Sequence, residues 1–345
     1  MEGIRPHILS RDPNQLEREF VERGWDGYRA AQVLRWVYRG VLDPARMGNI
    51  PKYLRDGLGE TYELALPPVA REVASDRDGS TKLALRLGDG RILECVHLRT
   101  PRLHTLCVSS QVGCALACTF CATGRMGLLR NLQPWEILAQ ILTLRLRTPP
   151  ERHVNVVFMG MGEPMANYER VLQAVRMANH EETLAVGARH FTVSTSGLVP
   201  GIRRLAGEQL QVGLAVSLNA PTDEQRSQIM PVNRRYPLGE LLKAVRFYVE
   251  TSRRHVTFEY VLLGGFNDSA ADARRLSRLT RDLPHKLNLI NWNPTPDASF
   301  RPSPRVDAFR DLLLAEGHRV TLRYSQGRDV NAACGQLGAD LLARA

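Results

Sequence analysis

Apolar and polar residues change their periodicity twice along the chain. The first stretch repeats apolar side chains at helical spacing, as at Val33, Leu34 and Val37. A second, shorter stretch alternates on either side of the turn Gly-Asp-Gly-Arg, which is typical of a β-hairpin. The remainder alternates apolar runs with helical patterns. We therefore predict a helical accessory domain, a β-hairpin extension and an α/β domain, over residues 1–66, 67–100 and 101–345.

The third stretch predicts repeated strand–helix units. Between its apolar runs lie helical patterns such as PWEILAQILTLRLR and PLGELLKAVRFYVETS. Units of this kind build a parallel sheet with helices outside it. Six or seven units fit an open, partial barrel of the (βα)6 type better than a complete eightfold barrel. The expected strands are HTLCVS, VNVVF, FTVSTS, LAVSLN, VTFEYVLL, LNLINWN and RVTLRYS.

Two features of the first 100 residues have more than one interpretation. Basic and aromatic residues interleave around Trp36, and they could hold RNA or cover a small helical core. Glu94 alternates in phase with Ile92, Val96 and Leu98, which places a carboxylate on the apolar face of the hairpin. Either this is an edge strand with unsorted faces, or the carboxylate serves to take a proton.

Charge and compartment limit the kinds of partner. The 345 residues carry a formal net charge of +10, which favours a polyanion such as nucleic acid, although an arginine-rich composition alone gives the same charge. The charged N-terminal residues do not resemble a secretory signal, and no apolar run approaches the roughly 18 residues of a membrane span. We expect a cytoplasmic protein without membrane contact. In a reducing cytosol, clustered cysteines indicate metal or redox chemistry rather than a disulfide framework.

The stretch GCALACTFCATG holds three cysteines, Cys114, Cys118 and Cys121, within eight residues. On a continuous helix they would form one stripe of buried thiols. A zinc site would need a fourth ligand, for which His104 or Cys107 are candidates near the preceding strand. An iron–sulfur cluster held by three cysteines leaves one iron open for a substrate or cofactor.

Small or polar residues follow several of the predicted parallel strands. The carboxyl ends of parallel strands meet at one rim, where βα-barrel enzymes place their chemistry. We therefore expect a binding site there that includes Gly162, Glu163, Ser194, Ser217, Asn219 and Asn293.

The motif C-x-x-x-C-x-x-C just after the first strand of a partial barrel resembles the radical S-adenosylmethionine (SAM) enzymes. The segments CVSSQVGC, CTFCATG, FMGMGEP, STSG, PVNRRYP and AACGQL follow one another as in the RlmN family of RNA adenine methyltransferases, over about residues 16–338. The last segment contributes Cys334, and Cys107 is a second lone cysteine. Lone cysteines are ordinarily buried as small apolar side chains, but the resemblance gives these two a catalytic role.

The resemblance implies a radical SAM partial barrel with a [4Fe-4S] cluster on Cys114, Cys118 and Cys121. It implies methylation of carbon 2 of an adenosine in 23S rRNA, and in tRNA as for some members of the family, with two SAM molecules used per methylation. An electron-donor protein such as flavodoxin or ferredoxin would be a partner, and we expect a monomer. The implied SAM-binding residues are Gly162, Glu163, Ser194, Ser217, Leu218, Asn219 and Asn293.

The implied reaction uses three further side chains. One SAM methylates the Cys334 thiolate, and a radical derived from a second SAM removes hydrogen from that methyl group. The resulting carbon radical adds to the adenine, Glu94 accepts the ring proton, and Cys107 attacks the Cys334 sulfur. The new disulfide releases the methylated RNA and must be reduced before the next turnover.

Alternatives remain at this point. Carbon-8 methylation of the Cfr type uses the same cluster and the same two cysteines. A zinc-dependent RNA-binding protein without catalysis and a radical enzyme for a small molecule are more distant possibilities. Two residues depart from the family pattern, because Asn331 stands where an acid is usual and Asn219 where some members have histidine. Cys95 matches no catalytic position and is expected to be structural.

Overall fold

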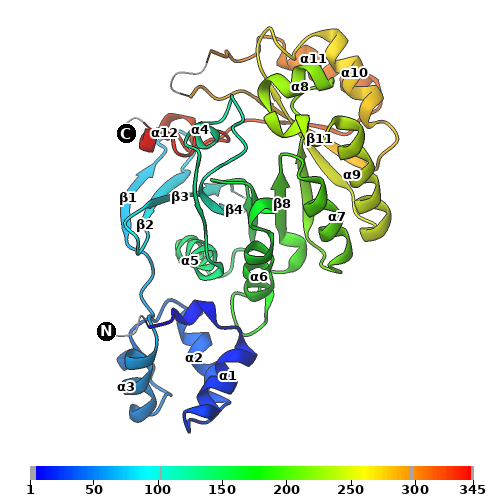
Figure 1. Ribbon diagram of the computed structural model, residues 1–345. Coiled ribbons are helices and arrows are strands. Elements are labelled where there is room, and N and C mark those ends of the chain that lie inside the picture. Colours follow the sequence, from blue (N-terminus) through cyan, green and yellow to red (C-terminus); the bar gives the residue numbers. More distant parts are fainter. Residues whose placement is uncertain (1–4, 102, 296–298, 343–345) are drawn as a thin grey trace.

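The computed structural model describes residues 5–101, 103–295 and 299–342. A curved ten-stranded sheet forms its centre, with the order β1-β2-β3-β4-β7-β8-β9-β10-β11-β12 (Figure 1). The strands of this sheet are Val69–Ala74 (β1), Thr81–Arg86 (β2), Ile92–Arg99 (β3), His104–Cys107 (β4), Val154–Phe158 (β7), Phe191–Thr195 (β8), Gly213–Ser217 (β9), Val256–Leu262 (β10), His285–Asn291 (β11) and Val320–Arg323 (β12).

The barrel part of the sheet is parallel and open. Strands β4 and β7 to β12 pair side by side in the parallel sense. Strands β1 and β12 lie at opposite ends of the order, and the described residues form no pairing that closes the sheet. The predicted partial parallel barrel is therefore confirmed, and the predicted strands HTLCVS to RVTLRYS all form.

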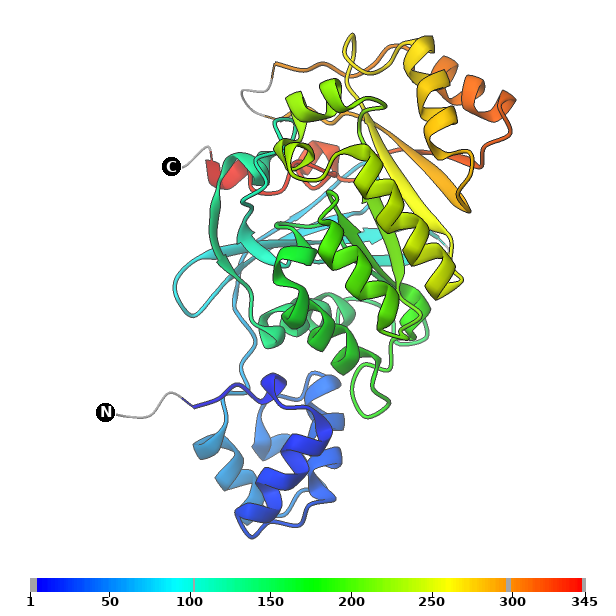
Figure 2. The ribbon, with the colours of Figure 1, turned by 45° about the vertical axis from the view of Figure 1, so that its right-hand side comes forward.

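Helices join consecutive parallel strands and cover the outer face of the sheet (Figures 1 and 2). Helix α7 is not among the helical patterns that we named from the sequence, and it contains Pro200 and Gly201. The structure places the proline in the first turn, where a missing N–H is tolerated, and packs the glycine against Met165. The helices are Pro13–Glu22 (α1), Arg29–Tyr38 (α2), Lys52–Thr61 (α3), Ala122–Arg125 (α4), Pro134–Arg145 (α5), Tyr168–Asn179 (α6), Val199–Gly207 (α7), Asp223–Ile229 (α8), Leu238–Ser252 (α9), Ala270–Thr280 (α10), Val306–Ala315 (α11) and Ala339–Leu342 (α12).

Helices α1 to α3 form a separate group at the N-terminal end (Figure 2). Val33, Leu34 and Val37 are fully buried, so the predicted apolar stripe builds a small helical core. Trp36 packs against this core, and its indole N–H donates to Asn49 Oδ1 at 2.6 Å. The aromatic part of the interleaved sequence thus covers a core, which is one of the two roles that we considered for it.

The hairpin extension continues the barrel sheet. Strand β3 pairs antiparallel with both β2 and β4, and Val96 lies opposite Cys107. The structure adds strand β1, which the sequence pattern did not predict, at the outer edge of the extension. A second, two-stranded sheet of Gln111–Gly113 (β5) and Leu128–Asn131 (β6) flanks the three-cysteine stretch. None of the helices in the described part of the chain is long and apolar enough to cross a membrane.

Candidate active site

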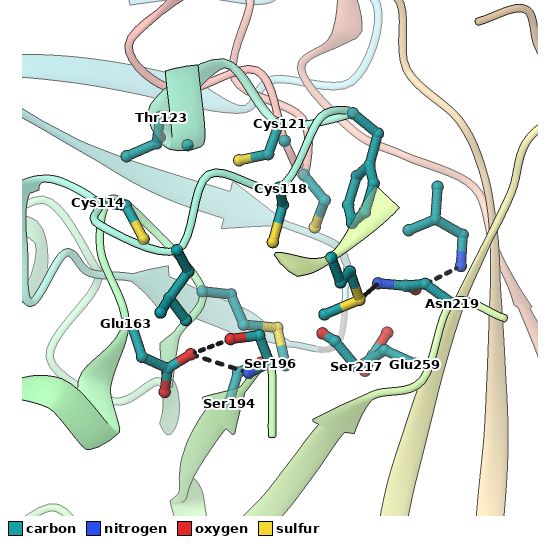
Figure 3. Close-up of a pocket in the computed structure, with 18 of the residues that line it drawn as sticks. Cys114, Cys118, Cys121, Thr123, Glu163, Ser194, Ser196, Ser217, Asn219 and Glu259 are labelled. Carbon is teal, nitrogen blue, oxygen red and sulfur yellow. Dashed lines mark hydrogen bonds between the residues drawn. The ribbon is translucent and has the colours of Figure 1, made fainter. Parts of the chain in front are cut away.

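A cavity lies at the carboxyl ends of the parallel strands, under the stretch with three cysteines (Figure 3). Its empty volume, including the open mouth, is about 980 Å³. The predicted rim is thereby brought together, because six residues that we singled out for it line this cavity. These residues are Gly162, Glu163, Ser194, Ser217, Asn219 and Asn293.

The cysteine loop, residues 113–124, forms the roof of the cavity. Gly113 has a φ of +76°, and a Cβ there would lie 1.9 Å from the Gly127 carbonyl oxygen, so only glycine fits the turn that starts the loop. The Cys114 N–H donates to the same oxygen at 2.8 Å. The loop stays irregular until α4 starts directly after Cys121. The three cysteines therefore do not form a stripe on one continuous helix.

The thiol groups of Cys114, Cys118 and Cys121 line the cavity and face the polar side chains at the strand ends (Figure 3). All three are free thiols. Burial raises the pKa of Cys114 to about 12 and also raises the pKa values of the other two. Within the described residues, no three His, Cys, Asp or Glu side chains surround a position for a single metal ion.

The donor set nevertheless fits an iron–sulfur cluster. Three cysteines from one short loop share one cavity, and thiolates are the ligands that iron–sulfur clusters take. The remaining cavity wall carries Asn293, whose Oδ1 is buried without a hydrogen-bond partner among the described residues. Such an orphaned polar atom indicates a polar ligand at this wall.

Glu163 organises the wall opposite the cysteine loop. It is 4% exposed, and its Oε2 accepts hydrogen bonds from the Ser196 N–H at 2.8 Å and the Ser196 hydroxyl at 2.7 Å. Its Oε1 accepts from the Met165 N–H at 3.0 Å. Burial raises the pKa of Glu163 in spite of these donors. The carboxylate thus ties together the segments that follow β7 and β8, where the sequence predicted a binding rim.

Of the two predicted binding residues that directly follow β9, one lines the cavity and the other does not. Asn219 adopts a left-handed conformation with φ of +57°, lines the cavity, and accepts the Val261 N–H on its Oδ1 at 2.9 Å. Leu218 is fully buried in the apolar core, and it is not among the described residues that line the cavity. Its N–H donates to the Glu259 carbonyl, and its own carbonyl accepts from Arg226. The structure therefore does not bring Leu218 to the cavity.

Cys334 reaches the cavity from the other end of the chain. The C-terminal segment, residues 327–342, lies against the cysteine loop, and the Ala122 N–H donates to the Gly335 carbonyl at 2.8 Å. The Thr123 hydroxyl donates to the Leu337 carbonyl at 2.6 Å, and the Asn293 amide donates to the Cys334 carbonyl at 3.0 Å. These bonds place the Cys334 side chain in the wall of the same cavity.

Cys107 lies next to this cavity. It ends strand β4 and lines a smaller neighbouring cavity, whose wall it shares with Cys334 and Met159. Met159 and Cys334 also line the large cavity, so the two spaces adjoin. Burial, followed by the nearby Cys334, raises the pKa of Cys107 to about 12. Both cysteines are free thiols, so the disulfide that we expected during turnover is not formed in this structure.

Glu94 does not line the large cavity in the described structure. It is 2% exposed and lies 3.3 Å from Lys82 Nζ, and its Oε2 accepts the Gly338 N–H at 2.7 Å. Lys82 also contacts Asp340 Oδ2 at 2.8 Å and the Asn331 carbonyl at 3.3 Å. In this arrangement the carboxylate anchors the C-terminal segment that carries Cys334.

Sequence reasoning missed two charged residues at this site. Glu259, on β10, lines the large cavity and accepts the Asn288 amide at 2.8 Å. Arg323, the last residue of β12, lines the small cavity beside Cys107 and Cys334. Glu259 had a signal in the sequence, because it is a charge within the otherwise apolar run VTFEYVLL, whereas Arg323 follows the polar alternation of VTLRY and gave none. Only the fold shows that both point inward.

Comparisons with known proteins agree with this geometry. The family model of the radical SAM superfamily matches residues 108–276. The model described as ribosomal RNA large subunit methyltransferase N-terminal domain matches residues 7–64. The chain is 47% identical to the dual-specificity RNA methyltransferase RlmN of Anaeromyxobacter dehalogenans, over 97% of this chain and 92% of that protein. This chain belongs to the RlmN family.

Other relatives support the same assignment. The RlmN protein of Geobacter sulfurreducens is 47% identical over 95% of this chain and 91% of its own length. The crystal structure of a radical SAM methyltransferase from Sphaerobacter thermophilus has a TM-score of 0.93 and 48% identity, covering 97% of this chain and 99% of that one. The predicted family, the radical SAM fold and the assignment as a methyltransferase are confirmed. Membership of this family argues against the alternative of a zinc-dependent RNA-binding protein without catalysis.

Proposed function

We propose that this protein methylates carbon 2 of adenosine in 23S rRNA and in tRNA, through a methyl group carried on Cys334. The observation that carries the proposal is the placement of Cys334. The fold brings this cysteine from the C-terminal segment to the wall of the cavity that the three-cysteine loop covers. A second thiol, Cys107, lies in the adjoining cavity that Cys334 also lines. A simple radical SAM site needs neither of these additional thiols.

Cys114, Cys118 and Cys121 would hold the [4Fe-4S] cluster, and Glu163, Ser194, Ser217, Asn219 and Asn293 would surround SAM at the strand ends. When bound, the cluster and SAM supply a carbon-centred radical, which can act at an adenine carbon that is too poor a nucleophile for ordinary methyl transfer. Two SAM molecules would be used per methylation, because Cys334 would take its methyl group from one and the radical would derive from the other. An electron-donor protein of the flavodoxin or ferredoxin type would supply the electron.

Cys334 and Cys107 have separate roles in covalent catalysis. Cys334 carries the carbon that becomes the new methyl group and links the protein to the base during the reaction. Cys107 attacks the Cys334 sulfur, so that an S–S bond replaces the bond between that sulfur and the transferred carbon. A reducing cytoplasm then restores the two thiols. Glu94 would accept the ring proton. To do so, its carboxylate would have to leave Lys82 and the Gly338 N–H and contact the substrate base.

The open mouth of the cavity and the positive net charge of the protein both suit an RNA substrate. The target base must leave its stack to reach the cavity, as in other enzymes that modify bases. The net charge of +10 provides attraction to phosphates, which salt should weaken. The N-terminal helices, with Arg35 exposed on α2, would add RNA contacts.

The proposal can be tested on anaerobically reconstituted protein. The protein is incubated with SAM, a reductant and either an rRNA fragment or tRNA, and the digested nucleosides are identified by mass spectrometry. We expect 2-methyladenosine from both RNAs and none from Cys334→Ala. Cys95→Ala is the matched control, because Cys95 is fully buried in the core and the mechanism does not use it.

Each other outcome would correct a different part of the proposal. The appearance of 8-methyladenosine would keep the two-thiol chemistry and change the target carbon. Product from rRNA alone would remove tRNA from the substrates. Product from Cys334→Ala at the wild-type rate would contradict the role of Cys334 altogether.

A further inference from the structure

A row of aromatic side chains leads outward from the wall of the large cavity. Phe120 and Trp292 both line that cavity, and the Trp292 indole N–H donates to the Phe120 carbonyl at 3.1 Å. Phe300 packs edge-on against Trp292 with ring centroids 6.2 Å apart, and Phe266 packs against Phe300 at the same distance. Phe266 and Phe300 are only partly buried, so the row starts at the cavity and ends at the protein surface. None of the proposed catalytic steps uses these two outer rings.

The outer rings lie on two segments, after β10 and after β11, that hydrogen bonds hold together. The Gly264 N–H donates to the Arg301 carbonyl at 2.8 Å. The Ser303 hydroxyl and the Gly265 N–H both donate to the buried Asp268 carboxylate, at 2.6 Å and 3.0 Å. Both segments lie at the same end of the barrel as α4 and α8 (Figures 1 and 2). The rings therefore have a fixed support, and a ligand that binds them would lose little entropy in ordering the protein.

Arg301 places a positive charge beside these rings. Its side chain is exposed, and a Cβ built on Gly265 would lie 3.5 Å from its Nη2, so the guanidinium lies over the residue that precedes Phe266. Among the described residues, no acceptor or carboxylate pairs with this guanidinium. Arg305 is exposed as well, and its Nη1 lies 4.0 Å from Asp268. An exposed guanidinium of this kind suits a phosphate, which can accept two of its N–H groups at once.

Flat rings beside an unpaired guanidinium are the groups that bind single-stranded nucleic acid. Bases stack on the rings, and the cation meets the phosphate between them. The position also fits, because a base that turns out of its stack into the cavity leaves its neighbours unstacked just outside the cavity wall. A protein partner would need only an apolar patch, whereas the combination of rings and cation matches bases and phosphates. The net charge of +10 favours the polyanion further.

We propose that Phe300 and Phe266 form a stacking site for an unpaired RNA base next to the methylated adenosine, and that Arg301 binds the adjoining phosphate. The inference rests on the proposed function, because it assumes that the cavity receives a base of an RNA. Phe300 contacts the base directly, and Trp292 supports its ring from the cavity side. The site helps to hold the target strand open and favours unpaired RNA over a duplex.

The test measures RNA affinity without any chemical step. Full-length protein with its reconstituted cluster is titrated into labelled RNA, and binding is followed by fluorescence anisotropy. The probes are the rRNA fragment, a single-stranded oligoadenylate and a fully paired RNA duplex of the same length. Phe300→Leu keeps an apolar side chain but loses the flat ring. We expect it to raise the Kd of the rRNA fragment and of the oligoadenylate by about tenfold and to leave the Kd of the duplex unchanged.

Arg301→Met tests the phosphate contact separately. A lost phosphate contact releases one counterion fewer, so the slope of log Kd against log salt concentration should decrease by about 0.7 for the oligoadenylate. Phe300→Leu should leave this slope as it is, because stacking neutralises no phosphate. Titrations at several salt concentrations give the slopes of the wild type and of both variants.

Further variants separate stacking from structure. Phe300→Tyr keeps the aromatic face and should bind the oligoadenylate within about twofold of the wild type. Phe247→Leu and Arg246→Met are the matched controls, because both residues are exposed on α9, and neither should change any Kd. SAM cleavage with dithionite and without RNA should run at the same rate in every variant. If Phe300→Leu changes that rate or the circular dichroism, Phe266→Leu supplies the comparison.

Three results would overturn the stacking site. They are an unchanged Kd of the unpaired RNAs in Phe300→Leu, an equal loss for the duplex, and failure of the wild type to bind the oligoadenylate. Slower SAM cleavage with reduced flavodoxin but not with dithionite, at unchanged RNA affinity, would also overturn it, because the rings would then bind a protein.

The stacking site and the proposed function can fail separately. Binding of unpaired RNA that depends on Phe300, together with an absence of 2-methyladenosine from the wild type, would contradict the proposed function and leave the stacking site in place. Formation of 2-methyladenosine by a wild type whose RNA affinity does not depend on the rings would overturn the stacking site alone.

Discussion

The cysteine loop and the C-terminal segment meet at one cavity, but they are built in opposite ways. The loop of residues 113–124 carries its three thiols within eight positions, so their closeness follows from local chain geometry. The C-terminal segment carries one thiol, Cys334, and depends for its place on bonds to residues more than 200 positions away. A cluster motif can thus be recognised by its spacing, whereas the second half of the site exists only in the folded chain.

We expect the strongest difference between the two regions when a cysteine is removed from each, because only the loss from the cysteine loop should remove cluster iron. Cys118→Ala removes one of three ligands, and we expect loss of most cluster iron and complete loss of methylated nucleoside. Cys334→Ala should lose the same product while keeping the wild-type iron and sulfide content, because Cys334 is not one of the three proposed cluster ligands. Iron analysis and the visible absorption spectrum of the reconstituted proteins give the measurement. Equal iron loss in both variants would mean that Cys334 is a fourth ligand.

The second prediction concerns the anchor of the C-terminal segment. Lys82 is 3% exposed and contacts Glu94, Asp340 and the Asn331 carbonyl. Replacing it in Lys82→Met leaves the buried Glu94 carboxylate without its cation, which should lower the free energy of unfolding by about 3 kcal/mol. The measurement is guanidinium denaturation at pH 7.

The double variant Lys82→Met/Glu94→Gln is the control for this anchor. It removes the uncompensated charge and should recover part of the loss. Equal stability of Lys82→Met and the wild type would show that these contacts do not hold the segment. The Cys118→Ala variant, compared without cluster, should show no such loss, because the cysteine loop is held by its own turn.

The weakest of the three expected effects is a loss of folding stability at acid pH, to which Asp340 contributes. Burial raises the pKa of Asp340, but hydrogen bonds from Lys82 and Asn331 lower it by more, so the net pKa lies below the usual value. A carboxylate with a depressed pKa stabilises the folded state above its unfolded pKa, and this contribution disappears as the pH falls through the folded pKa. Stability should therefore decrease below about pH 4, and this part of the decrease should be absent in Asp340→Asn. Denaturation midpoints at pH 7, 4 and 3 measure it, and parallel curves for both proteins would contradict the assignment.

The same contrast explains which features the sequence predicted. Apolar runs such as VNVVF predict buried strands because their pattern is local, and the cysteine spacing predicts a ligand loop for the same reason. The antiparallel pairing of β3 with β4 joins the hairpin to the barrel, and no local pattern reports it. The anchoring of Glu94 by Lys82 and Gly338 and the position of Arg323 beside two cysteines also depend on long-range contacts. The family resemblance implied Leu218 as a SAM-binding residue, but its side chain, directly after β9, lies in the apolar core.

In the proposed reaction, Cys334 carries the transferred carbon and Cys107 releases it. The most direct measurement uses the reconstituted Cys107→Ala variant, incubated with SAM, a reductant and an rRNA fragment, and then digested for mass spectrometry. We expect an adduct in which the peptide containing Cys334 is joined to adenosine through one carbon, and little free 2-methyladenosine. Free 2-methyladenosine at the wild-type rate, with no adduct on Cys334, would contradict these roles of Cys334 and Cys107.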